Sequence, residues 1–137
     1  AAIEMSEVLL KLAKTGPLHP YPYEVGEGSI SVAGMIREMV WDRKKGTPQE
    51  VAIKRFHDTI CRMVEDAVER TRARTGLTIV ALSGGTWQNR YLLSVVPAAL
   101  RARGYKVLRH SRVPANDGGI SLGQAVVACQ RWEEKCV

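Results

Sequence analysis

The sequence lacks the features of several large protein classes. Its 137 residues contain no apolar run near the roughly 20 residues that cross a bilayer, so no membrane segment is expected. Its 12 glycines and 6 prolines follow no period, which excludes a collagen-like chain. Apolar residues make up 45% of the chain, enough to build a core, which argues against disorder. The length suits one domain of about 100–150 residues.

Common catalytic and cofactor motifs are absent as well. The three cysteines (Cys61, Cys129 and Cys136) form no C-x-x-C pair, which argues against a zinc ribbon or a thioredoxin-like site. No G-x-G-x-x-G, Walker A loop or G-x-S-x-G elbow occurs, so the Rossmann, P-loop and serine-hydrolase signatures are missing. We expect reduced thiols in a cytoplasmic protein. The chain begins at Ala1 within a helical pattern and without Met, which suggests an excised part of something longer.

Acidic residues are scarce in the second half of the chain. Residues 1–75 hold 12 basic and 11 acidic residues, whereas residues 76–137 hold 8 basic and 3 acidic ones. Most of the net charge of +6 therefore lies in the C-terminal part, where it favours phosphate-bearing partners or forms a solvated basic face. We do not expect a nucleic-acid partner, because no block of consecutive basic residues and no recognition motif is present.

Hydrophobic periodicity predicts an α/β fold. Residues 1–75 read as a mainly helical part with a small hairpin around Gly26 to Gly28, and residues 76–137 read as a β-α-β-α part. Thr47 is the expected N-cap of a long helix that begins at Pro48 and ends at Gly76. Pro97 is expected to kink or split a later helix. The other expected elements are helices at 1–14, 33–44, 87–102 and 120–133, and strands at 78–82 and 105–109.

The β-α-β unit at 78–109 has a chemical consequence. A helical crossover makes the two strands parallel, so the loops that follow them lie at one edge of the sheet. One loop is Ser83-Gly84-Gly85 and the other contains Asn116-Asp117-Gly118-Gly119. The apolar strand at 78–82 is expected to be buried on both faces.

Two glycine turns, each followed by a helix, make a plausible phosphate cradle, because helix N-termini offer free N–H groups. Arg90, Arg109 and Arg112 lie near the same edge, and Asp117 is the only acid between Glu69 and Glu133. A carboxylate beside phosphates needs a cation between them, which suits a divalent-metal ligand. The alternative is that Asn116-Asp117-Gly118 is only a turn that caps the last helix.

Two long motifs resemble one family. They are ALSGGTWQNR at 81–90 and VPANDGGISLGQA at 113–125, and together they look like the C-terminal end of the hydrogenase-maturation carbamoyltransferases of the HypF family. The opening AAIEM and the AIKRFH stretch at 52–57 also resemble that family. The resemblance therefore spans the chain.

The resemblance implies one lobe of an actin-like (ASKHA) ATPase fold. It implies a role in moving a carbamoyl group from carbamoyl-adenylate, made from carbamoyl phosphate and ATP, to the C-terminal cysteine of a HypE-type partner. That reaction supplies the cyanide ligand of nickel–iron hydrogenase. A divalent metal, Mg or Fe, is implied too. The competing reading is a non-catalytic nucleotide-binding or scaffold module.

The resemblance also assigns site residues by position. It implies nucleotide binding by Ser83, Gly84, Gly85, Asn89, Asn116, Gly118 and Gly119, and metal binding by Asp117. The family's other metal ligands are a histidine pair expected upstream of Ala1, and His19, His57 and His110 do not stand at those positions. We therefore expect the catalytic residues upstream, and little or no turnover by this chain alone.

Overall fold

The computed structural model describes Leu9 and residues 16–133, which form an α/β arrangement as the sequence predicts. The predicted helix at 1–14, apart from Leu9, and Cys136 lie outside the described residues. A small antiparallel hairpin forms where expected, with Val25 opposite Ile30. The elements are β1 (Glu24–Val25), β2 (Ile30–Ser31), α2 (Ala33–Lys45), α3 (Gln49–Thr75), β3 (Ile79–Leu82), the 3-10 helix η2 (Gly85–Gln88), α4 (Arg90–Ala102), β4 (Lys106–Arg109), the 3-10 helix η3 (Asp117–Gly119) and α5 (Ile120–Glu133).

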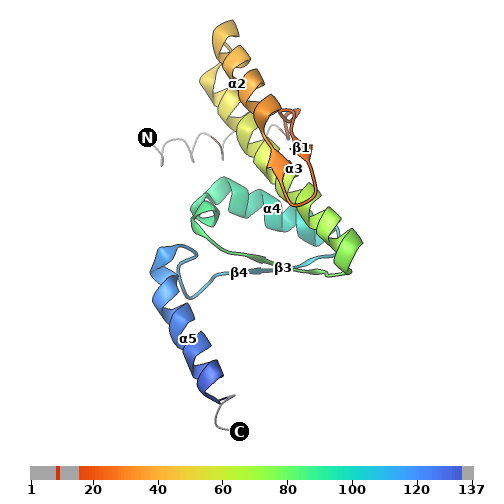
Figure 1. Ribbon diagram of the computed structural model, residues 1–137. Helices are drawn as coiled ribbons and strands as arrows, with labels where there is room; N and C mark the ends of the chain where they lie inside the picture. The colour runs from red at the N-terminus through yellow and green to blue at the C-terminus, as the bar shows by residue number, and fades with distance from the viewer. Residues whose placement is uncertain (1–8, 10–15, 134–137) are drawn as a thin grey trace.

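The core lies between α3, α4 and a parallel two-stranded sheet. Strands β3 and β4 are joined by α4 and pair in parallel, with Leu82 opposite Arg109 at their carboxyl ends. Figure 1 shows α4 between the sheet and α3. Apolar side chains from all four elements close this space: Cys61, Leu82, Leu92, Val96, Leu100 and Val107. Residues 16–75 and 76–109 therefore contribute to one core.

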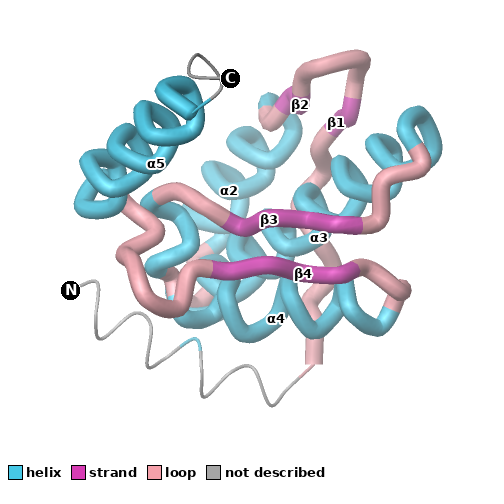
Figure 2. The backbone as a smooth tube through the Cα atoms, turned by 90° about the horizontal axis from the view of Figure 1, so that it is seen from below, coloured by secondary structure: helices cyan, strands magenta, loops and turns pink. Residues whose placement is uncertain are grey.

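The sheet is covered on one face only within the described residues. Leu82 and Val107 point toward α4 and are buried, whereas Ile79 is 57% and Leu108 is 47% exposed. In the view of Figure 2 both strands lie in front of the helices. The expectation that β3 is buried on both faces is wrong for this part of the chain, because no described element packs on the second face.

The ends of the helices follow local signals in part. Gly76 ends α3 in the left-handed conformation with φ of 69°, as predicted. Thr47 is not the N-cap of α3: Pro48 takes that place, and the Thr47 hydroxyl donates to Asp42 instead. Helix α4 continues through Pro97 without splitting, because buried Val96 and Leu100 hold the helix on both sides of the proline.

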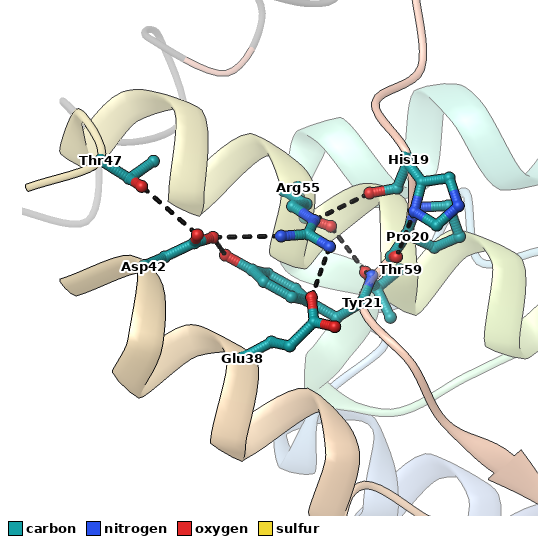
Figure 3. A network of polar contacts seen from close by, with 8 residues as sticks. All are labelled: His19, Pro20, Tyr21, Glu38, Asp42, Thr47, Arg55 and Thr59. Carbon is teal, nitrogen blue, oxygen red and sulfur yellow. Dashed lines mark hydrogen bonds and ion pairs between the residues drawn. The ribbon is translucent and has the colours of Figure 1, made fainter. Parts of the chain in front are cut away.

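Arg55 of α3 joins three separate segments (Figure 3). Its guanidinium donates to Glu38 over 2.6 Å and to Asp42 over 3.2 Å on α2, and to the His19 carbonyl over 2.9 Å. The same group lies 4.0 Å from the centre of the Tyr21 ring. The Tyr21 hydroxyl donates to Asp42 over 2.7 Å. The extended segment before β1 is thereby fixed against both helices.

Helix α5 extends away from the other elements (Figure 1). Its side chains from Ile120 to Trp132 are exposed, although several of them are large and apolar. Among the described residues, no helix combines the length and the apolar character needed to span a membrane.

Candidate functional site

The two glycine turns meet at the carboxyl edge of the sheet, as the β-α-β unit predicts. The Gly84 N–H donates to the Ala115 carbonyl over 2.8 Å, which joins the turn after β3 to the turn after β4. One residue earlier, Ser83 Oγ lies 2.9 Å from His110 Nε2. Main-chain and side-chain contacts thus hold together two loops that are about thirty residues apart in the sequence.

The turn after β3 needs a glycine for its conformation. Gly84 has φ of 100° and ψ of 165°, a combination that side chains rarely adopt. A Cβ added at Gly84 or Gly85 would meet no atom within 4 Å, so space lies open in front of this turn. The backbone of the turn is therefore accessible to a ligand, and η2 and α4 begin directly after it.

The turn before α5 is tightly packed. The Asn116 side chain accepts a hydrogen bond from the Gly118 N–H over 3.1 Å, and the Asn116 carbonyl accepts one from the Gly119 N–H over 3.0 Å. A Cβ on Gly119 would lie 2.7 Å from the Pro114 carbonyl oxygen, closer than such atoms can come. The capping turn considered from the sequence is thus present. It holds Asp117 exposed at the first position of η3.

Asp117 belongs to no larger group of metal-binding side chains in the described part of the chain. Across Leu9 and residues 16–133, no group of three His, Cys, Asp or Glu side chains is placed to hold a metal ion. An exposed carboxylate near a turn that phosphate groups can reach is chemically suited to bind a divalent cation.

Asn89 has a structural role that its predicted nucleotide contact does not include. Its Oδ1 accepts hydrogen bonds from the Tyr91 N–H over 3.0 Å and the Leu92 N–H over 3.2 Å, which makes Asn89 the N-cap of α4. Its Nδ2 lies 3.0 Å from Nε2 of His57 on α3. The predicted nucleotide contact of Asn89 stays a prediction. An Asn before a helix is a capping signal that could have been read directly.

A buried ionic cluster supports the same end of α4. Asp58 of α3 accepts hydrogen bonds from Lys54 Nζ over 2.6 Å, from the Leu18 N–H over 2.7 Å and from the Tyr91 hydroxyl. Burial, and then the Asp58 carboxylate, raises the pKa of Tyr91. The helical spacing suggests an Asp58–Arg62 pair, but Arg62 contacts Glu65 and Asp66 instead. Asp58 is buried and accepts three other hydrogen bonds, whereas Arg62 is exposed.

Three arginines lie exposed near the joined turns. Arg90 is the first residue of α4, Arg109 is the last of β4, and Arg112 lies in the loop that leads to Ala115. They give this edge of the sheet a positive character that suits phosphate groups.

Comparisons with known proteins identify the family. The family described as "Carbamoyltransferase, Kae1-like Domain, second subdomain" matches residues 1–124. Carbamoyltransferase HypF of Rhizobium leguminosarum bv. viciae is 36% identical over 79% of this chain, and that of Rhodobacter capsulatus is 33% identical over 88%. The matched parts are 14% and 15% of those proteins, so the chain spans about one seventh of their length.

The fold agrees with a solved structure. A crystal structure described as full-length HypF in the phosphate- and nucleotide-bound form aligns with a TM-score of 0.81 and 35% identity. The alignment covers 96% of this chain and 17% of that one. The predicted α/β lobe is therefore confirmed, and the chain belongs to the HypF carbamoyltransferase family, in which it matches the second subdomain of the Kae1-like domain.

Proposed function

We propose that this chain forms the nucleotide- and metal-binding part of a cytoplasmic carbamoyltransferase. In this proposal, the complete enzyme makes carbamoyl-adenylate from carbamoyl phosphate and ATP. It then transfers the carbamoyl group to the C-terminal cysteine of a HypE-type partner for hydrogenase maturation. The observation that carries the proposal is the Gly84–Ala115 hydrogen bond, because it places both glycine turns at one edge of the sheet in a member of this family.

The residues of the joined turns have distinct tasks in this proposal. The Gly85 N–H approaches the nucleotide phosphates, where the open space in front of the turn leaves room, while the Gly84 N–H stays bonded to Ala115 and keeps the two turns together. The Ser83 hydroxyl and the turn at Asn116, Gly118 and Gly119 complete the contact surface. The nearby arginines lower the cost of gathering negative charge.

Asp117 is the proposed metal ligand of this part. A bound Mg²⁺ or Fe²⁺ ion would neutralise phosphate charge. The exposed carboxylate provides one hard oxygen ligand for such an ion, on a turn that Asn116 and Gly119 keep in shape.

A chimeric enzyme tests the proposed activity. In Rhizobium leguminosarum HypF, the segment that corresponds to this chain is replaced by residues 1–137, and carbamoylation of a HypE-type protein is measured with carbamoyl phosphate, ATP and Mg²⁺. The chimera should transfer the carbamoyl group. Its Asp117→Asn variant should lose most of that activity. The isolated 137-residue chain should show little or no transfer. A folded but inactive chimera would contradict the proposal.

A non-catalytic nucleotide-binding or scaffold module is the second candidate, favoured by the absence of a three-ligand metal cluster among the described residues. Calorimetric titration of the chain with ATP, with and without Mg²⁺, separates the two candidates. Binding that needs Mg²⁺ and is lost in Asp117→Ala favours the carbamoyltransferase. Equal binding without the metal and in the variant favours the module.

A further inference from the structure

A buried histidine lies behind the proposed nucleotide turn. His57 is on α3, is only 8% exposed, and meets Phe56 and Tyr91 edge-on at 5.4 and 5.9 Å between ring centres. Its ring is largely shielded from solvent. Both of its ring nitrogens nevertheless have hydrogen-bond partners.

The protonation of this histidine follows from its partners. Nδ1 lies 2.8 Å from the Ile53 carbonyl oxygen, which only accepts, so Nδ1 carries the proton. The Asn89 Oδ1 accepts from two backbone N–H groups, so the other end of that amide is the NH₂ group. This group donates to His57 Nε2, which therefore carries no proton and accepts through its lone pair. The Ile53 carbonyl at one end and the Tyr91 and Leu92 N–H groups at the other thus fix which atoms of His57 and Asn89 donate and which accept.

This chain of hydrogen bonds connects the interior of α3 with the first turn of α4. An unprotonated Nε2 is the only arrangement in which the Asn89 amide can both cap α4 and satisfy the ring. Without an acceptor at this point, the amide NH₂ loses its buried partner and can rotate, and the cap on Tyr91 and Leu92 is weakened. The capped helix end directly follows η2, which contains Gly85.

We propose that His57 is a positioning residue for the nucleotide turn and acts through Asn89. It holds the Asn89 amide in the orientation that fixes the start of α4, and thereby the backbone of residues 84–88. The proposal rests on the proposed nucleotide function for its effect on binding. The His57–Asn89 connection itself does not depend on that function.

Two substitutions separate positioning from simple packing. His57→Phe keeps an aromatic ring and removes the acceptor, whereas His57→Gln supplies an amide oxygen that can accept from Asn89. Val64→Ala, on the same helix and packed against the core, is the control for general loss of stability. All variants are made in the 137-residue chain.

Amide hydrogen exchange is the first measurement, because it does not need a nucleotide. We expect His57→Phe to speed exchange at Tyr91 and Leu92 about tenfold relative to Leu100, and His57→Gln to restore most of the protection. Val64→Ala should leave this ratio unchanged. In a ¹⁵N NMR spectrum of the wild type, the His57 ring should be the tautomer with its proton on Nδ1. An unchanged ratio in His57→Phe, or an Nε2–H form, would overturn the proposal.

The second measurement is the dissociation constant for ATP with Mg²⁺. It should rise about tenfold in His57→Phe and stay near the wild-type value in His57→Gln and Val64→Ala. Wild-type affinity in His57→Phe would overturn the positioning role while the proposed function stands. Wild-type protein that binds no nucleotide would instead contradict the proposed function, and the exchange ratio would still decide the role of His57.

Discussion

At the scale of single residues, the site depends on glycines whose requirements differ. Gly84 is needed for its backbone angles, since a Cβ there meets no atom. Gly119 is needed for space, since a Cβ would lie 2.7 Å from the Pro114 oxygen. Gly85 has neither constraint, because it has ordinary angles and open surroundings. The glycines of one motif are therefore not equivalent.

This difference gives a matched pair of variants. Gly84→Ala should lower the free energy of unfolding by about 1–3 kcal/mol, because alanine is strained at a φ of 100°. Gly85→Ala should change it by less than about 0.5 kcal/mol, the usual range for an unconstrained surface site. Urea unfolding of both variants measures the difference. Equal losses of unfolding free energy in the two variants would show that the positive φ of Gly84 does not exclude other residues from this position.

At the scale of elements, tyrosines fasten the extended segment and the hairpin to the helices. Burial and a hydrogen bond to Asp42 raise the pKa of Tyr21 to about 12, and burial and Asp66 do the same for Tyr23. The ordinary tyrosine value is near 10. The folded protein therefore keeps these protons at a pH at which the unfolded chain has lost them.

The resulting prediction concerns alkaline stability. The contribution of Tyr21 to stability is fully present below pH 10 and disappears as the pH rises through about 12. The free energy of unfolding of the wild type should fall over this range more steeply than that of Tyr21→Phe. Denaturant unfolding at a series of pH values measures both slopes. Parallel slopes would mean that the Tyr21 hydroxyl is not held by Asp42.

The sequence predicts the elements well where signals are local. Gly76 alone marks the end of α3. Two short strands joined by a helix predict a parallel strand pair, which β3 and β4 form. Prediction fails where contacts made outside a helix override its own local signal. Asp42 binds the Thr47 hydroxyl and removes the expected cap, and core packing carries α4 through Pro97. The His57–Asn89 contact joins residues 32 positions apart, so no local pattern reveals it.

At the scale of the whole molecule, charge and exposed apolar surface are both placed away from the α3–α4 core. The basic excess lies in residues 76–137, and three of its arginines lie near the joined turns. The uncovered face of the sheet and helix α5 carry exposed apolar side chains, with Trp132 exposed by 74%. The chain spans about one seventh of the length of the curated relatives it matches, and full-length relatives therefore have much more chain that could cover such surfaces.

The charge distribution predicts a salt dependence of nucleotide binding. The arginines attract the ATP phosphates over a distance that salt screens. Raising NaCl from about 0.05 M to about 0.5 M shortens this electrostatic screening length about threefold, so ATP binding should weaken several-fold. Adenosine, which lacks phosphates, is the control and should bind equally at both concentrations. Calorimetry at both salt concentrations provides the measurement. Salt-independent ATP binding would show that the basic edge does not contribute.

The central claim is that the two joined turns form a single nucleotide site. Backbone amide signals of the isotope-labelled chain, followed by NMR during titration with ATP and Mg²⁺, test it most directly. The account predicts that signals from residues 83–90 and 115–119 shift together with one dissociation constant, and that Asp117→Asn weakens both sets of shifts. Shifts confined to one turn, or shifts that centre on other surfaces, would contradict it.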